Sequence, residues 1–358
     1  MLSPLPGGIG VKLCVDGSFW GAGSPPSARH VTRDLVKSWA SEYPDDELTV
    51  VVPHSSIDEV SAISPSVSAV PVRRILNRVP QAATAMSLGW GTKCDAVITH
   101  NFASLAPGVV RACLVHDALF VDHPEWFTRV ERLYFNAIRP ALRSADVVLT
   151  TSQTESDRIA RVWPETSERI HPIGLASASD VVNAVSREPD NAPQRRFILA
   201  VGRINTRKNL ARLIDAYQLF RSSVPNVDLI IVGGRDGRID TLADAQGVSF
   251  TGHVDDAELR WYYERCSLFC FPSLGEGYGL PLIEAATLGA RIVCSELPVF
   301  RELNVADDYF DPLDVQDIAA VLERNINAQS EIADQTRLTD SWTSVVARAR
   351  TALMERLT

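Results

Sequence analysis

The sequence predicts an α/β protein of two domains, each built on a doubly wound parallel sheet. Short apolar runs alternate with amphipathic helical patterns along the whole chain, which is typical of parallel strands covered by helices. A polar stretch with two prolines, residues 186–196, interrupts this alternation, and the pattern then starts again. The length of 358 residues fits two domains at about 150 residues each.

The expected elements follow the chain in order. In the first half, strands are expected at residues 11–15, 48–52, 67–72, 96–99, 112–115 and 147–150, and helices at 28–41, 124–144 and 153–162. In the second half, strands are expected at residues 197–201, 227–232, 248–251, 268–271 and 291–294, and helices at 209–222, 256–266, 281–288 and 315–327. We place the domains at residues 1–188 and 189–340, followed by a last segment at 341–358. Ligands of such sheets bind at the carboxyl ends of the strands, so we expect a cleft between the domains.

Composition limits the function classes. A formal net charge of −9 argues against nucleic acid as a partner. No apolar run reaches the ~18 residues of a membrane span, and the N-terminus lacks the charged and apolar regions of a signal peptide, so cytoplasm is the expected compartment. The six cysteines form no C-x-x-C pair and are expected to be reduced thiols.

The segment at residues 273–284, SLGEGYGLPLIE, carries the strongest functional signal. Its alternating glycines, at positions 275, 277 and 279, separate an apolar strand from a helical run. They allow positive φ and close approach of a ligand, and the helix behind them directs its positive dipole end at that ligand. Carboxylates bind sugar hydroxyls and repel phosphate. The acids Glu276 and Glu284 in this loop and the first helical turn therefore predict a site for a sugar linked to phosphates.

Cations follow the first strand of the second half. Gly202 ends the strand, and Arg203, Arg207 and Lys208 come directly after it. An arginine fork and a lysine point charge suit a diphosphate. We assign Arg203 and Lys208 to this role and expect Arg207 to be solvated.

Weaker signals occur at other strand ends. Gly21 and Gly23 lie in the turn after the first strand, where their N–H groups would face a phosphate or the acceptor. His116 ends a strand of the first half and is expected at the cleft, and backbone groups near Val254 would read a base edge. No D-x-D motif occurs, so no carboxylate pair for a divalent ion on a nucleotide-sugar is present. We therefore expect no metal and no cofactor, with cations and amides stabilising the diphosphate.

These residues in this order resemble the retaining glycosyltransferases of the GT-B fold, specifically glycosyltransferase family four. The resemblance is carried by Gly202-Arg203-x4-Lys208-Asn209, by the T-G-H-V at residues 251–254, and by the E-x7-E spacing of Glu276 and Glu284. It is strong over residues 197–303 and weaker before them. The fold implied is GT-B, with two Rossmann-like domains facing across a cleft and a C-terminal helix that crosses back to the first domain.

The resemblance also implies roles for single residues. Arg203 and Lys208 would bind the donor diphosphate, Glu276 the donor sugar, Glu284 the ribose, and His116 would lie beside the reacting centre. Further contacts to the substrate are expected from the backbone and side chains of Gly277, Tyr278, Gly279 and Leu280. This chain departs from the family's pattern at the first glycine turn, where Gly23 is followed by Ser24, Pro25 and Pro26.

The activity implied is transfer of a hexose, mannose or rhamnose by general resemblance, from a nucleotide-diphosphate sugar to a glycan or lipid-linked acceptor in cell-envelope polysaccharide synthesis. Two basic patches of the first domain are candidates for contact with a membrane. One contains Arg73, Arg74 and Arg78, and the other contains Trp126, Phe127, Arg129 and Arg132. A peripheral contact at the inner face of the membrane and a plain solvated surface are both open. A sugar-nucleotide epimerase and a non-catalytic nucleotide-sugar-binding subunit remain as alternatives.

Overall fold

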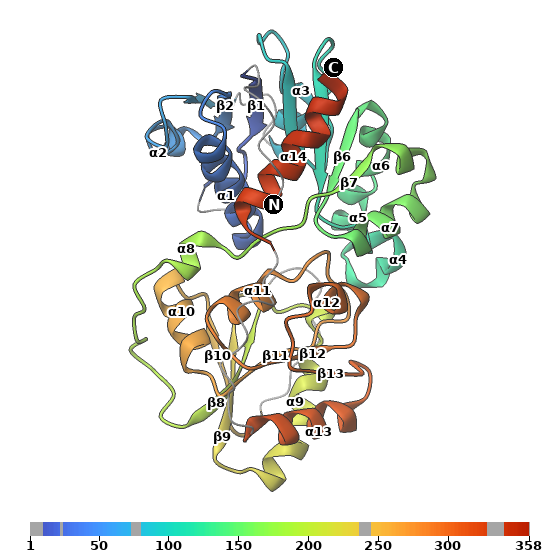
Figure 1. The fold of residues 1–358 in the computed structure, drawn as a ribbon. Helices are drawn as coiled ribbons and strands as arrows, with labels where there is room; N and C mark the ends of the chain where they lie inside the picture. The colour runs from blue at the N-terminus through green and yellow to red at the C-terminus, as the bar shows by residue number, and fades with distance from the viewer. Residues whose placement is uncertain (1–9, 22–23, 73–79, 236–244, 328–339, 358) are drawn as a thin grey trace. The chain divides into compact units, whose positions relative to one another are not determined.

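The computed structural model describes residues 10–21, 24–72, 80–235, 245–327 and 340–357. The chain forms two compact units. Unit 1 contains residues 1–118, 133–175 and 340–358, and unit 2 contains residues 119–132 and 176–339. The polar stretch at 186–196, expected to be the linker, thus lies within unit 2. Figure 1 shows both units with their elements labelled.

Unit 1 is built on a seven-stranded, fully parallel sheet in the order β3-β2-β1-β4-β5-β6-β7. Its strands are β1 Lys12–Asp16, β2 Glu47–Val52, β3 Val67–Pro71, β4 Ala96–His100, β5 Val110–Val115, β6 Val147–Thr150 and β7 Ile170–Pro172. Its helices are α1 Pro26–Glu42, α2 Ile57–Ser61, α3 Pro80–Ser87, α6 Ile138–Ala141, α7 Gln153–Val162 and α14 Trp342–Leu357, with short 3-10 turns at η1 His54–Ser56, η3 Leu142–Ser144 and η4 Pro164–Arg169. The sequence order reverses at β1, which lies between β2 and β4.

Unit 2 repeats this topology with six parallel strands in the order β10-β9-β8-β11-β12-β13. The strands are β8 Arg196–Val201, β9 Val227–Val232, β10 Val248–Gly252, β11 Leu268–Phe271, β12 Ile292–Ser295 and β13 Asp308–Phe310. The helices are α4 Leu119–Asp122, α8 Ser179–Val182, α9 Leu210–Ser223, α10 Asp256–Arg265, α11 Leu280–Thr287, α12 Pro298–Leu303 and α13 Val315–Ile326, with 3-10 turns at η2 Pro124–Trp126 and η5 Thr206–Lys208. Helix α5 Arg129–Phe135 begins in unit 2 and ends in unit 1.

The core of unit 2 shows why the alternating pattern folds in this way. One face of the sheet contributes fully buried Ile198 and Leu229, and α9 covers that face with Leu213, Tyr217 and Phe220. These helix residues recur at intervals of three and four, which places them on one side of α9. The apolar face of the helix and the apolar strands therefore form one continuous core.

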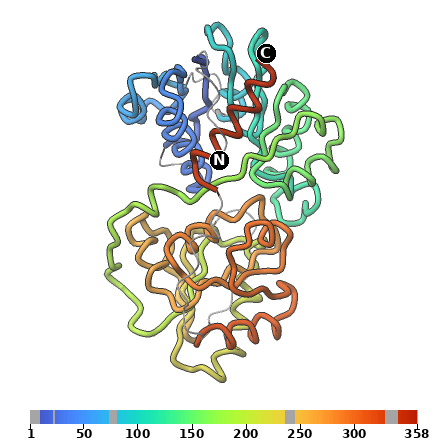
Figure 2. The backbone as a smooth tube through the Cα atoms, in the orientation of Figure 1, coloured from blue at the N-terminus to red at the C-terminus, as the bar shows by residue number. Residues whose placement is uncertain are grey.

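Helix α14 joins the two ends of the chain within unit 1. It packs on α1 and on strands β5, β6 and β7, and Figures 1 and 2 show its red ribbon beside the blue α1. Arg350 donates to both oxygens of Asp46, at 2.9 and 3.1 Å, across 304 positions of sequence. Asp46 in turn accepts from Trp39 Nε1 and from the backbone N–H of Val11. The last helix is therefore an integral part of the first unit.

The structure corrects one expected element. The helix predicted over residues 124–144 is wrong, because this stretch divides into η2, α5, α6 and η3. Phe127 adopts an extended conformation that ends η2, and Pro140 lacks the N–H that a continuous helix requires. The edge strands β7 and β13 were not expected, because three residues are too few to form a visible apolar run.

Candidate functional site

The candidate donor site lies at the reversal point of the unit 2 sheet. Strand β8 is flanked by β9 and β11, so the connections after β8 and β11 leave the sheet on opposite sides. Ligands of doubly wound sheets bind where the connections diverge in this way, beyond the carboxyl ends of the strands. Gly202 and Arg203 follow β8, and the glycine loop follows β11.

A short turn positions the cations after β8. Asn205 caps η5 by accepting from the N–H of Lys208, and Asn209 adopts a left-handed conformation with φ of 57° before α9 begins. The side-chain amide of Asn209 then donates to the carbonyls of Pro272, at 3.1 Å, and Pro312, at 2.7 Å. The turn after β8 is thus tied to the segment that opens the glycine loop after β11.

Glu276 joins the two segments electrostatically. Lys208 Nζ lies 2.7 Å from Glu276 Oε1, and Arg207 Nη1 lies 2.5 Å from Glu276 Oε2. Arg207 Nη1 also donates to the carbonyl of Gly275 at 2.8 Å, which holds the glycine loop directly. Lys208 Nζ lies 4.4 Å from the centre of the Phe271 ring, in the range of a cation–π contact. All three charged side chains are nearly buried, at 10 to 13% exposure.

The protonation of this cluster follows from burial and charge. Burial alone would raise the pKa of Glu276, but the charges of Arg207 and Lys208 outweigh it and lower that pKa to about 2. Burial lowers the pKa of Lys208 to about 8, against the opposing effect of Glu276. At neutral pH the cluster therefore holds two cations and one anion, with one net positive charge.

The cluster overturns one expectation from the sequence. Arg207 was expected to be solvated, and this is wrong: its side chain is 13% exposed and is shared between Glu276 and the Gly275 carbonyl. The signal that was missed is its distance of one position from Lys208 in a tight 3-10 turn, which allows both side chains to reach one carboxylate. Arg203, on the same segment, is half-buried and its charge contributes to lowering the pKa of Lys208.

Gly202 makes room for the lysine. Its φ of 150° is one that residues with a side chain rarely adopt, and a Cβ added there would lie 2.9 Å from Cε of Lys208. The glycine after β8 is therefore required both by the backbone conformation and by the path of the lysine side chain.

Glu284, the second acid of the motif, lies later in its helix than the sequence suggested. Gly279, with φ of 121°, precedes α11, which begins at Leu280. Glu284 is the fifth residue of this helix, in the second turn and not the first. Its carboxylate is 5% exposed and accepts from the hydroxyl of Tyr263 at 2.9 Å. The hydrogen bond fixes one oxygen of the carboxylate, and the buried Tyr263 holds the helix against α10.

The remaining predicted contacts of unit 2 lie on the same connections. Gly277, Tyr278 and Leu280 are buried in the glycine loop and the start of α11. Val254 is half-buried between β10 and α10. Their roles toward a substrate stay predictions, as do those of Arg203, Lys208, Glu276 and Glu284.

In unit 1, His116 directly follows β5 and is half-buried. Its Nε2 lies 3.1 Å from Nδ1 of His100, the last residue of β4, and the planes of the two rings are nearly parallel, at 5°. Sequence reasoning missed His100, although it follows an apolar run just as His116 does. Gly21 lies in the turn after β1, and Gly23 falls outside the described residues.

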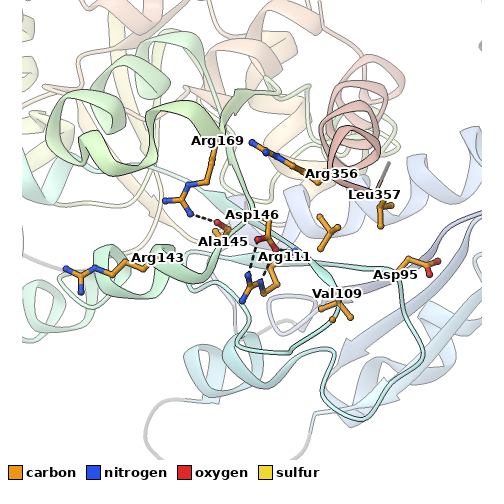
Figure 3. Close-up of a pocket in the computed structure, with 11 residues that line it drawn as sticks. Asp95, Val109, Arg111, Arg143, Ala145, Asp146, Arg169, Arg356 and Leu357 are labelled. Atoms are coloured by element: carbon orange, nitrogen blue, oxygen red, sulfur yellow. Dashed lines mark hydrogen bonds and ion pairs between the residues drawn. The ribbon is translucent and has the colours of Figure 1, made fainter.

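A separate cavity opens at the amino ends of the unit 1 strands. It has a volume of about 510 Å³ and is lined by Arg111, Arg143, Arg169 and Arg356, with two aspartates (Figure 3). Arg111 pairs with both oxygens of Asp146 at 2.9 Å, and Arg169 donates to backbone carbonyls, including that of Ala145. Two of the four arginines of this cavity, Arg111 and Arg169, are thus engaged in contacts within the fold.

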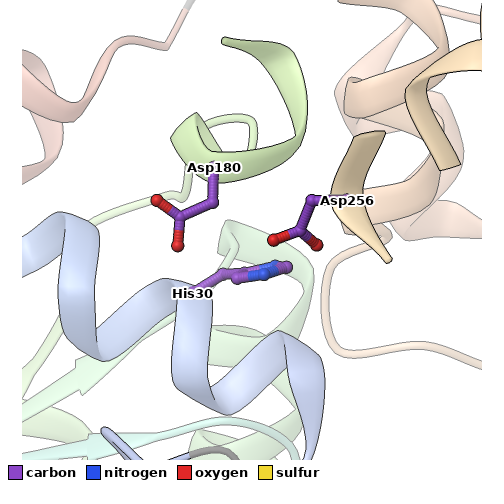
Figure 4. A group of neighbouring side chains, drawn as sticks. All are labelled: His30, Asp180 and Asp256. Atoms are coloured by element: carbon purple, nitrogen blue, oxygen red, sulfur yellow. The ribbon is translucent and has the colours of Figure 1, made fainter. Parts of the chain in front are cut away.

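One group of potential metal ligands occurs among the described residues, formed by His30, Asp180 and Asp256 (Figure 4). His30 belongs to unit 1, whereas both aspartates belong to unit 2. Neither unit by itself supplies all three ligands, and we assign no metal to these residues.

Comparison with known proteins shows which family the second half of the chain resembles. Residues 183–338 match the model of the family described as Glycosyl transferases group 1. This region of the chain is therefore similar to that family. The match covers the unit 2 sheet, the cation turn and the glycine loop.

Two curated relatives are mannosyltransferases of Escherichia coli. Over 239 residues the chain is 28% identical to the serotype-specific mannosyltransferase WbdA, covering 61% of this chain and 29% of the relative. Over 231 residues it is 29% identical to the O-antigen chain mannosyltransferase B, covering 60% of this chain and 61% of the relative. The chain thus spans less than two thirds of the length of these relatives.

Solved structures confirm the fold class. The chain is similar to WaaG, a glycosyltransferase involved in lipopolysaccharide biosynthesis, with a TM-score of 0.65 over 96% of this chain and 99% of that one, at 16% identity. The GT-B class with two Rossmann-like domains is confirmed. How the two domains face each other stays a prediction. Within the described residues, we find no helix with the length and apolar character that crossing a bilayer requires.

Proposed function

We propose that this protein is a retaining hexosyltransferase of the family described as Glycosyl transferases group 1. It takes its sugar from a nucleotide-diphosphate donor and transfers it to a glycan or lipid-linked acceptor in cell-envelope polysaccharide synthesis. The observation that carries the proposal is the buried cluster of Lys208, Arg207 and Glu276 at the reversal point of the unit 2 sheet. The names of the relatives, both mannosyltransferases, favour mannose as the sugar.

The cluster suits the departure of a diphosphate. As the C1–O bond of the donor sugar breaks, negative charge moves onto the diphosphate, and Lys208 and Arg203 lie on the segment that would receive it. Fixed cations in a water-poor site stabilise such charge without reorganisation, and each is worth roughly 2.7–4 kcal/mol of barrier. The acceptor hydroxyl attacks C1 from the same face, and its proton passes to the departing phosphate. No divalent metal or other cofactor is needed in this proposal.

Glu276 has a second role in this scheme. In the free protein it pairs with both cations and cancels one of their two charges, which lowers the cost of burying them. A donor diphosphate would take over part of that neutralisation, leaving the carboxylate available to accept from a sugar hydroxyl. Donor binding and sugar recognition would then depend on the same side chain.

The test is nucleoside diphosphate release by the purified protein. GDP-mannose, UDP-glucose and dTDP-rhamnose are each supplied with and without a polyprenol-linked or mannan acceptor, in buffer with and without EDTA. We expect acceptor-dependent release with GDP-mannose, unchanged by EDTA. Conversion of the donor sugar without acceptor would indicate an epimerase, and saturable donor binding with no transfer to any acceptor would indicate a binding subunit.

The control variants separate the cluster from the general charge of unit 2. Lys208→Met is expected to reduce turnover by roughly a hundredfold or more. Arg301→Met removes an exposed arginine that pairs with Glu296 on the surface of the same unit, and it is expected to retain wild-type turnover. Equal activity of both variants would contradict the assignment.

We also propose that the protein acts at the cytoplasmic face of a membrane, through helix α5. Val130 and Leu133 on this helix are each 78% exposed and, three positions apart, lie on one face. Arg129 and Arg132 of the same helix would attract anionic lipids. The other basic patch, with Arg73, Arg74 and Arg78, lies outside the described residues. Flotation with anionic liposomes should recover the wild type but not a Val130→Ser, Leu133→Ser variant, and equal recovery would contradict this contact.

A further inference from the structure

Three side chains in unit 1 form a hydrogen-bonded row that ends at His116. Thr32 lies on α1, His100 ends β4, and His116 follows β5. The distances are 3.3 Å from Thr32 Oγ1 to His100 Nε2, and 3.1 Å from His100 Nδ1 to His116 Nε2. Thr32 and His100 are buried, whereas His116 is half-buried.

The direction of the first hydrogen bond follows from Thr32. Its hydroxyl has one hydrogen, and its oxygen lies 2.8 Å from the carbonyl oxygen of Ala28, one turn earlier in α1. A carbonyl oxygen can only accept, so the hydrogen of Thr32 is committed to Ala28. The contact with His100 therefore requires that Nε2 of His100 carries the proton and donates to Thr32.

The second direction follows from the first. Burial lowers the pKa of His100 to about 3, and burial also lowers the pKa of His116, so both rings are neutral at pH 7. A neutral imidazole carries one proton, which in His100 is on Nε2, and its Nδ1 is then an acceptor. His116 must consequently donate from its own Nε2, which leaves Nδ1 of His116 unprotonated.

Ring packing and backbone hydrogen bonds also hold the row in place. The ring of Phe19 contacts the His100 ring edge-on, with centroids 5.5 Å apart and an angle of 83°. On the other side, the backbone of His116 is fixed by two hydrogen bonds, from its N–H to Asn101 Oδ1 and from Thr151 Oγ1 to its carbonyl. Among the described residues, no hydrogen bond of His116 uses Nδ1.

We infer that Thr32 and His100 are positioning residues that fix His116 as the tautomer protonated on Nε2, so that its Nδ1 accepts a hydrogen bond from a hydroxyl group of the sugar substrate. The identity of that ligand rests on the proposed function. The arrangement assigns His116 to recognition: a neutral ring with a bare Nδ1 has no proton to give a leaving group from that atom. It also agrees with a reaction in which the departing phosphate takes the acceptor proton.

The first test reads the tautomer directly and needs no activity. Protein labelled with ¹⁵N-histidine is examined by long-range ¹H–¹⁵N correlation at pH 7, where protonated and bare ring nitrogens have well-separated shifts. His100→Gln and His116→Asn assign the signals by their loss. We expect Nε2 protonated and Nδ1 bare in both residues. A His116 ring protonated on Nδ1 overturns the inference.

The second test measures the effect of the row on catalysis. Thr32→Val removes the acceptor for His100, Thr32→Ser restores it, and Thr49→Val is the matched control because its hydroxyl contacts Ser68 at the surface of the same sheet. We expect Thr32→Val to lower kcat/KM for the donor by about three- to tenfold, the size of one neutral hydrogen bond, mainly through a higher KM, as loss of a recognition contact requires. We expect Thr32→Ser and Thr49→Val to match the wild type.

The outcomes separate the two proposals. If Thr32→Val and Thr32→Ser have the same kcat/KM for the donor, the positioning role is wrong, whatever the reaction is. If the wild type transfers no sugar from any donor, the proposed function is wrong, and the ¹⁵N spectrum still decides the tautomer.

Discussion

Removing either partner of the buried cluster in unit 2 should have unequal effects on stability. Glu276→Gln leaves Lys208 and Arg207 as buried cations without an anion, whereas Lys208→Met leaves Glu276 still paired with Arg207. Breaking a buried pair by removing one partner costs about 3–5 kcal/mol when a charge is stranded. The geometry therefore predicts that the glutamate variant is much the less stable of the two.

The magnitudes follow from the pKa values. The pKa of Glu276 falls from 4.5 to about 2, and at 1.36 kcal/mol per unit this is about 3 kcal/mol of stabilisation of the ionised form. The pKa of Lys208 falls from 10.5 to about 8, a cost of similar size for keeping that lysine charged. We expect Glu276→Gln to lower the unfolding free energy by about 3 kcal/mol and Lys208→Met by less than about 1 kcal/mol.

Urea denaturation of both variants, as a function of pH, is the assay. The folded pKa of Glu276 is below its unfolded value, so its contribution is complete above about pH 4.5 and is lost as the pH falls toward 2. The difference between wild type and Glu276→Gln should shrink over that window. A Lys208→Met variant less stable than Glu276→Gln at pH 7, or a difference that does not change with pH, would refute this reasoning.

Three further predictions concern single sites. Gly202→Ala should weaken binding of a nucleoside diphosphate at least about tenfold, measured by calorimetry, because the new methyl group would displace the Lys208 side chain; unchanged affinity would contradict this. Cys94 should be the first cysteine alkylated by iodoacetamide at pH 7, as read by mass spectrometry, because a hydrogen bond with a buried neighbouring thiol lowers its pKa; labelling of another thiol first would argue against it. Burial raises the pKa of Asp16 to about 6 and lowers that of His100 to about 3, so their effects on stability oppose each other between about pH 4 and 6. Asp16→Asn should make the unfolding free energy rise with pH by about 1.4 kcal/mol per unit more steeply than in wild type over this window, and an unchanged slope in denaturation experiments would be evidence against the buried carboxyl.

The fold class and most of the sheet could be predicted from the sequence alone. Eleven strands were expected from apolar runs of four to six residues, and each lies within about two residues of its observed place. Such runs are readable because strands covered on both faces must be apolar throughout. The prediction of one helix at 124–144 was wrong because the hydrophobic pattern of this stretch does not show that an extended residue, Phe127, interrupts the helix.

The site divides in the same way. The order of Gly202, Lys208, Glu276 and Glu284 was readable, because a family motif is a property of sequence. Tertiary structure decided that Arg207 shares the carboxylate with Lys208, since this depends on how a 3-10 turn aims two adjacent side chains at a loop 68 positions away. It also decided the row from Thr32 through His100 to His116, whose members come from three separate elements. Spacing along a chain records which residues are present, whereas the hydrogen-bond direction and charge of each depend on neighbours that only the folded chain supplies.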